Sequence, residues 1–162
     1  MEIKVSIGEI VDKLSILHIK KEKITDKVKS ENILKEYLYL HEIVFAELNI
    51  DYSVFDKLLN INEELWNIED EIREKELAKE FDYRFIELAR LVYITNDSRA
   101  EFKKYINSLY NSEFVEEKSY SDYKLSKIEI MYNELVQIPS DINEHLPTLR
   151  EYSEKCKHIT EM

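Results

Sequence analysis

The sequence predicts an all-α fold, a compact antiparallel helical bundle of about five to seven helices. Two observations lead to this prediction. The chain has one glycine and two prolines among 162 residues, so few positions suit the tight turns that join β-strands. Good helix formers abound, and apolar residues recur at spacings of three and four, which is the period of an amphipathic helix. The length is that of one domain, expected to span residues 1–162.

The first predicted helix begins at Ser6 and ends near Lys23. Ser6 is placed to cap it, and Glu9 follows three residues later as in a capping box. One stripe of this helix is apolar and should face the core: Ile7, Ile10, Val11, Leu14 and Leu17. The opposite stripe is typical of a solvated face that another element covers in part: Glu9, Asp12, Lys13, Ile16 and Lys20.

The next two helices are predicted from their caps and their apolar spacing. One runs from the cap Ser30 to about Leu48, antiparallel to the first helix. The other runs from the cap Ser53 to about Lys79. Its apolar face also contains Asn62, Glu69 and Arg73. Polar groups in such a position must find partners, because burial without a hydrogen bond is costly.

The second half of the chain predicts four more helical segments. Asp82 should cap a helix whose apolar residues cover nearly its whole circumference, which indicates a central element and places Arg90 on a buried helix. Asp97 should cap a fifth helix that runs from Ser98 to about Tyr110. Two further helices are predicted around residues 125–135 and 147–159, the first ended by Pro139.

The acidic composition and the absence of certain signals exclude several function classes. A net charge of −11 repels nucleic acid. No stretch approaches the roughly 20 apolar residues that span a bilayer, so no membrane is expected as a partner. A single Cys156 and a charged start favour a reducing cytoplasm. The oligomeric state is left open, a homodimer being one alternative.

Arginine usage points to a candidate site for a small anionic or phosphorylated ligand. Arginine is favoured over lysine where a planar fork holds a carboxylate or phosphate in a partly dry site. Only five arginines stand against eighteen lysines, and three of the five lie on or beside faces predicted to be buried. The candidate ligand-binding residues are Asn62, Trp66, Glu69, Arg73, Arg90, Tyr93, Asn96, Asp97, Arg99 and Lys103.

The same charges have a structural interpretation. Glu69 with Arg73, and Arg90 with Asp97, can form ion pairs that only fix helix register. The chain would then be a structural or protein-interaction module. Trp66 is likewise a core side chain in one interpretation and a stacking wall in the other.

A third alternative is a magnesium-dependent nucleotide hydrolase. Glu63, Asp70 and Glu74 form an acidic stripe on one helix, and carboxylates so spaced can hold Mg²⁺ when a facing helix adds more. The stripe is similar to that of the all-α nucleotide pyrophosphohydrolases. Here, however, Arg90 stands where the facing helix should supply a metal ligand. A solvated charged face is the usual meaning of such a stripe, and whether the chain is an enzyme is left open.

Five local strings resemble a family of bacterial and phage proteins catalogued as a domain of unknown function: residues 6–17 (SIGEIVDKLSIL), 65–73 (LWNIEDEIR), 85–93 (FIELARLVY), 96–100 (NDSRA) and 116–120 (EEKSY). The resemblance covers about residues 5–120 and leaves 121–162 as a C-terminal extension. It implies no activity. It does imply that polar residues dominate the motifs, which raises the odds of a site that includes Glu9, Asp12, Lys13 and residues 116–120 beside the candidates above.

Overall fold

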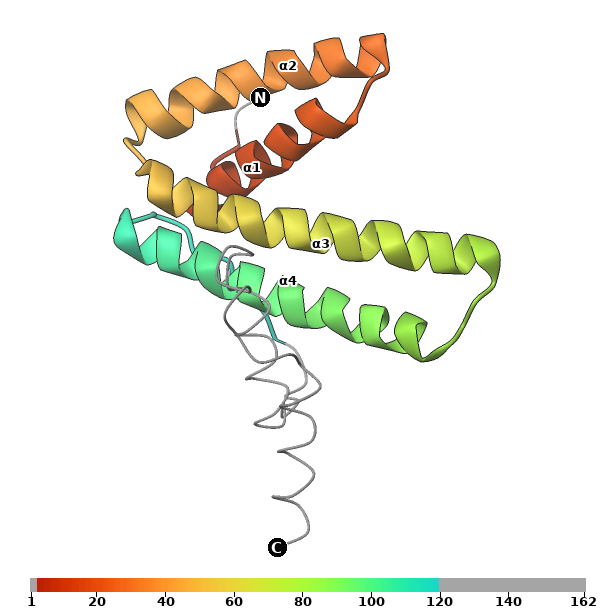
Figure 1. The fold of residues 1–162 in the computed structure, drawn as a ribbon. Helices are drawn as coiled ribbons and strands as arrows, with labels where there is room; N and C mark the ends of the chain where they lie inside the picture. Colours follow the sequence, from red (N-terminus) through yellow and green to blue (C-terminus); the bar gives the residue numbers. More distant parts are fainter. Residues whose placement is uncertain (1–2, 120–162) are drawn as a thin grey trace, which may run out of the picture. The chain divides into compact units, whose positions relative to one another are not determined.

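The structure, a computed structural model, describes residues 3–119. This part of the chain is helical and contains no β-strand, which confirms the all-α prediction. Its elements follow in order along the chain (Figure 1): α1 Ile7–Lys23, α2 Lys27–Glu42, the short π-helix η1 Ile43–Glu47, α3 Tyr52–Ala78 and α4 Tyr83–Leu109.

This part of the chain contains four α-helices where five were predicted. The predicted total of five to seven helices is therefore not supported. The difference lies in α4, which runs without interruption through Asn96 and Asp97. The helix start predicted at Asp97 is therefore wrong, and the Asn96 amide just before it donates to the carbonyl of Val92 at 3.0 Å, one turn back along the same helix. No glycine or proline interrupts this stretch. The helices predicted around 125–135 and 147–159 lie outside the described residues.

Two of the predicted helix starts are confirmed. The side chain of Ser6 accepts a hydrogen bond from the backbone nitrogen of Glu9 at 3.3 Å and caps α1. The carboxylate of Asp82 does the same for Phe85 at 3.0 Å and caps α4. In both places a short polar side chain satisfies a backbone N–H group that has no partner within the helix.

The other two caps were predicted too late in the chain. Asp26 caps α2, while Ser30 lies inside the helix and donates its hydroxyl to the carbonyl of Ile24 at 2.8 Å. Asp51 caps α3 and accepts from the backbone nitrogen of Ser53 at 2.7 Å. An earlier carboxylate was available in each case, so each helix begins before the serine.

The end of the predicted second helix is wound more widely than an α-helix. The backbone nitrogen of Leu48 donates to the carbonyl of Ile43, five residues back, at 2.9 Å. This spacing defines the π-helix η1. The chain then reverses at Asn49, whose φ of 53° lies in the left-handed region that asparagine tolerates.

The fourth helix was predicted to be the central one. The helices instead pack around α1. Helices α3 and α4 form a long antiparallel hairpin, and α1 packs on both of them as well as on α2 (Figure 1). Among the described helices, α2 contacts α1 and η1. The first half of α4 is exposed at Tyr83, Ile86 and Arg90, because none of the other helices within residues 3–119 covers that end of the hairpin.

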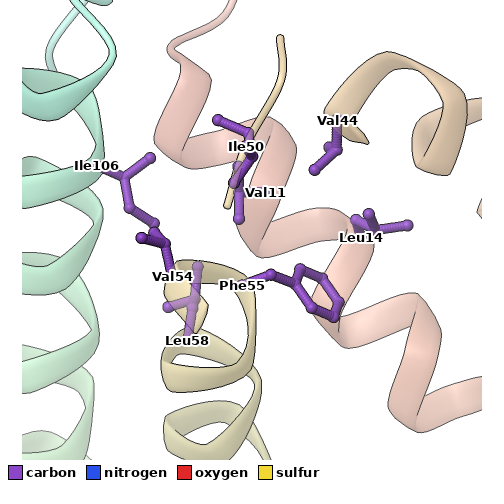
Figure 2. Packing of buried hydrophobic residues seen from close by; sticks show 8 residues of the cluster. All are labelled: Val11, Leu14, Val44, Ile50, Val54, Phe55, Leu58 and Ile106. Carbon is purple, nitrogen blue, oxygen red and sulfur yellow. The ribbon is translucent and has the colours of Figure 1, made fainter. Parts of the chain in front are cut away.

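The apolar core lies where α1, η1 and the paired ends of α3 and α4 meet (Figure 2). The residues predicted to face inward from α1 include Val11 and Leu14, which are fully buried. Eight buried side chains make up this core: Val11, Leu14, Val44, Ile50, Val54, Phe55, Leu58 and Ile106. Residues 1–117 form a compact unit of their own. None of the described helices has the length and apolarity to span a membrane.

Candidate functional site

A buried carboxylate, that of Asp12 on α1, lies at the centre of a polar cluster. Its side chain is only 4% exposed. Arg99 from α4 holds it in a bidentate grip, with Nε 2.8 Å from Oδ1 and Nη2 2.6 Å from Oδ2. Asn62 from α3 donates to Oδ1 at 2.9 Å. One carboxylate thus joins three helices, and charge-assisted bonds of this kind are the strong ones.

A second cation, the ammonium of Lys103, lies next to this pair with 8% of its side chain exposed. It forms ion pairs with Glu9 of α1 and, at 3.0 Å, with Glu116 of the segment after α4. Oδ2 of Asp12 is 4.0 Å away. We call this group the Asp12 cluster; its members are Glu9, Asp12, Ser15, Asn62, Asn96, Arg99, Lys103 and Glu116.

The remaining hydrogen bonds show that the cluster is internally satisfied. Ser15 donates to the carbonyl oxygen of Asp12 at 2.8 Å and accepts from the Asn62 amide at 2.7 Å. Nη1 of Arg99 donates to Oδ1 of Asn96 at 3.3 Å. Buried polar side chains are stable when their hydrogen-bonding capacity is met in this way.

The electrostatics of the cluster keep both cations charged. The hydrogen bonds that Arg99 donates to Asp12 outweigh desolvation and raise the pKa of Arg99 above its ordinary range. For Lys103 burial alone would lower the pKa, but the hydrogen bonds to Glu9 and Glu116 and the charge of Asp12 together raise it. Three carboxylates face two cations, so the cluster carries one negative charge in surplus.

The close approach of α1 to α4 depends on Gly8, the single glycine of the chain. Its backbone nitrogen donates to Oδ1 of Asn107 at 2.7 Å. A Cβ atom at this position would lie 2.7 Å from the carbonyl oxygen of Lys103. Any other residue would hold the two helices apart and lengthen the contacts between Asp12 and Arg99.

The structure brings together four of the ten residues predicted from the sequence, namely Asn62, Asn96, Arg99 and Lys103. Glu69 and Arg73 instead form an ion pair of 2.7 Å one turn apart on α3, as the structural interpretation predicts, and the Arg73 side chain is 66% exposed. Their position on a buried face was therefore predicted wrongly. Helix α3 extends beyond the end of α1, so its face is uncovered there.

Three further candidates lie on α4 away from the cluster. Asp97 precedes Arg99 by two residues, which places it on nearly the opposite side of the helix. Tyr93 is 41% exposed, and Arg90, predicted to be buried, is exposed as well. These residues have interactions of their own.

Trp66 of α3 is partly buried beside the end of α1. Its indole Nε1 is shielded from solvent and has no hydrogen-bond partner. Nζ of Lys23 lies 6.0 Å from the centre of the ring and donates to Asn67 at 3.3 Å. These contacts fit a packing role for Trp66. That a ligand stacks on its ring stays a prediction.

The acidic stripe does not assemble into a metal centre within residues 3–119, where no three histidine, cysteine or acidic side chains are arranged to hold an ion. Asp70 lies 3.6 Å from Arg73. The carboxylates of Glu9, Asp12 and Glu116 do converge, but the ammonium of Lys103 occupies the position that a cation would take.

The sequence predicted that Asp12 and Glu9 lie on a solvated face covered in part by another element. This is wrong for Asp12, which is buried, whereas the Glu9 side chain remains 39% exposed. Their partners come from α4, close to 90 residues later in the chain. Two signals in the sequence pointed to them. Gly8 is a glycine inside a helix, which often marks a close approach of two backbones. The motifs that resemble a known family also include Asp12 and Glu116.

Comparisons with known proteins agree with that resemblance. The sequence profile of a family described as "Family of unknown function (DUF6165)" matches residues 1–139. The match extends the similarity beyond the boundary near residue 120 that the motifs suggested. No curated protein and no solved structure matches the chain.

Proposed function

We propose that the chain, which belongs to a family of unknown function (DUF6165), is a protein-interaction module. In this proposal the hydrogen bonds and ion pairs of the Asp12 cluster hold α1 on the α3–α4 hairpin. The far end of that hairpin is the surface that meets a partner. Of the alternatives considered from the sequence, this one agrees best with the contacts of the cluster.

The observation that carries the proposal is a set of large apolar side chains at the end of the hairpin. Leu77 is 85% exposed, Tyr83 72%, Phe81 57% and Ile86 54%. Single exposed apolar residues are ordinary, but a group of them within ten residues is typical of an interaction site. We call residues 77–86 the hairpin tip.

Ion pairs join the two arms of the hairpin beside its tip. Nζ of Lys75 lies 2.8 Å from both Glu80 and Asp82, across the turn. Arg84 donates from two nitrogen atoms to the carboxylate of Glu71, each at 2.7 Å. A surface that is ordered before binding loses less entropy when a partner docks, which favours affinity.

The Asp12 cluster supports this function by elimination. Its two cations are already paired with three carboxylates of the same unit, so an incoming anion meets a net negative charge. Arg99, one of the three arginines predicted to bind a ligand, holds Asp12 instead. The cluster therefore provides packing specificity between helices rather than an empty site.

Site-specific crosslinking tests the proposal. A photoreactive phenylalanine analogue in place of Leu77 should give a covalent adduct of one discrete mass in the cells that produce the protein. The matched control carries the same analogue in place of Leu38, an exposed leucine on α2 (58%). An adduct at position 77 and not at 38 supports the module. Equal labelling at both positions, or none at 77, contradicts it.

A second candidate is the small-anion site predicted from the sequence, and one contact favours it. Glu116 belongs to the non-helical segment after α4, yet its carboxylate lies 3.0 Å from the ammonium of Lys103. A phosphate or carboxylate ligand would make the same contact after displacing this side chain. The ligand would then be fixed by Lys103, Arg99 and Asn96.

A thermal-shift titration separates the two candidates. In the anion hypothesis, Glu116→Gln removes the competing charge, so inorganic phosphate or a sugar phosphate should raise the melting temperature more in the variant than in the wild type. In the interaction module neither protein responds. Glu117→Gln, which breaks the neighbouring 2.8 Å pair with Lys104, is the matched control.

A further inference from the structure

We infer that the partner of the hairpin tip is a basic, amphipathic protein segment, an inference that rests on the proposed interaction module. The exposed apolar side chains of the tip lie among many acidic residues. Residues 69–87 contain eight aspartates and glutamates against four lysines and arginines. The apolar tip is thus surrounded by a net negative charge of four.

The four basic residues of this stretch are not available to attract an acidic partner. Each is already in an ion pair within the hairpin: Arg73 with Glu69, Lys75 with Glu80 and Asp82, Lys79 with Glu76, and Arg84 with Glu71. The surplus carboxylates, among them the exposed Glu74, set the local potential. A partner with complementary charge must be positive around its apolar contacts.

The same charge opposes two other occupants of the tip. A second copy of this chain would bring a second net negative charge to a contact between tips, and like charges across an interface lower affinity and slow association. An anionic membrane surface would be repelled in the same way. A protein segment with lysines or arginines beside an apolar stripe meets neither obstacle.

The geometry of the tip suits a helix with one apolar face. Leu77 lies in the last turn of α3, Tyr83 begins α4 and Phe81 lies in the turn between them. These exposed side chains come from both arms of the hairpin and from the turn that joins them. A partner helix with apolar residues at a spacing of three or four can cover them, with its basic residues directed to the flanking carboxylates.

Fluorescence anisotropy with designed peptides tests the inference on the full-length protein. The probes are a labelled helical peptide of leucine and lysine with one apolar face, its leucine and glutamate counterpart, and a lysine peptide without leucine. The leucine and lysine peptide should bind most tightly, and raising the salt from about 50 to 500 mM should weaken its binding. Leu77→Ser should weaken it by about tenfold or more.

Two variants separate the apolar from the electrostatic contribution. Leu38→Ser removes a leucine of similar exposure from α2 and should leave binding unchanged. Glu74→Lys reverses a charge beside the tip and should weaken binding several-fold, whereas Glu31→Lys on α2 should have little effect. Circular dichroism checks that each variant is folded.

Each remaining outcome overturns the inference in a recognisable way. Equal binding of the two amphipathic peptides removes the role of charge, and equal loss in Leu77→Ser and Leu38→Ser removes the role of the tip. Binding to phosphatidylglycerol vesicles in place of the peptide identifies a membrane surface, and dimerisation abolished by Leu77→Ser identifies a second copy. An adduct at position 77 with an acidic partner would overturn this inference while leaving the interaction module intact.

Discussion

At the residue scale, Arg73 and Arg99 have the same side chain and different surroundings. They should therefore differ in how much each contributes to the free energy of unfolding. Arg99 is 23% exposed and closes a bidentate pair on a carboxylate that is 4% exposed. Arg73 is 66% exposed and pairs with a neighbour one turn away on its own helix. Charge pairs matter most where removing one partner leaves the other buried and uncompensated.

Arg99→Ala should therefore lower the free energy of unfolding by about 3 kcal/mol or more, because it strands the Asp12 charge among three helices. Arg73→Ala, the matched control, should cost less than about 0.5 kcal/mol, as exposed pairs of this spacing do. Urea unfolding followed by circular dichroism measures both. Similar losses in the two variants would show that burial does not set the weight of these arginines.

Gly8→Ala should destabilise the protein by about 1–3 kcal/mol, because the added Cβ forces α1 and α4 apart. The clash would be with backbone, 2.7 Å from the carbonyl oxygen of Lys103, and backbone yields less easily than a flexible side chain. The direction of the change in stability makes this a sharp test. In a helix without that contact alanine is more stable than glycine by about 1 kcal/mol, so a stabilised variant would refute the close approach.

At the scale of single elements, helix α4 has a start that the sequence predicted and a continuity that it did not. The Asp82 cap follows from a local pattern and is confirmed. The continuity of α4 through Asn96 and Asp97 was not predictable in this way, because both residue types cap helices as readily as they occur within them. The chain adopts the continuous helix. This outcome depends on a distant contact, in which Arg99 of α4 reaches Asp12 of α1.

The turn of the hairpin should lose stability in acid and in strong base. The hydrogen bond from Lys75 and the backbone N–H of Phe85 lower the pKa of Asp82 below its ordinary 3.8. A carboxyl group whose pKa is lowered by folding stabilises the folded state at pH values above its ordinary pKa. This contribution is lost as the pH falls through the lowered pKa. The hydrogen bonds to Asp82 and Glu80 raise the pKa of Lys75 to about 12. That contribution is present below 10.5 and lost as the pH rises through about 12.

Asp82→Asn tests this pH dependence. Thermal melting at a series of pH values should show the variant less stable than the wild type at neutral pH, with the difference shrinking as the pH falls below 3.8. Asp56→Asn removes an exposed carboxylate from α3 without touching the turn, and serves as the control. A difference that persists unchanged in acid would mean that the carboxylate charge does not hold the turn.

At the scale of the whole molecule, α1 connects parts of the chain that are far apart in sequence. It packs on α2, α3 and α4, and on its polar side Asp12 is buried although Lys13 is exposed. The apolar core and the Asp12 cluster thus lie on two faces of one central helix. Breaking the cluster should loosen the attachment of α1 to α4 without dissolving the hairpin itself.

Divalent cations should leave the molecule unaffected. In the Asp12 cluster the ammonium of Lys103 already lies between the converging carboxylates, where a metal ion would have to bind, and Asp70 of the acidic stripe lies beside Arg73. Millimolar Mg²⁺ or Mn²⁺ should therefore shift the melting temperature by less than about 1 °C, since a ligand stabilises only what it binds. A clear stabilisation that disappears in Asp70→Asn would instead support the metal-dependent hydrolase.

The sequence by itself determined the helical class, the course of α1 and two of the caps. Those features depend on the spacing of apolar residues and on contacts within a few positions, which are readable along one chain. Tertiary structure alone decided that Asp12 is buried, that α1 is the central helix and that Arg73 is exposed. Burial depends on which helix covers which face, and Asp12 becomes an interior residue only because Arg99, 87 positions later, is brought to it by the fold.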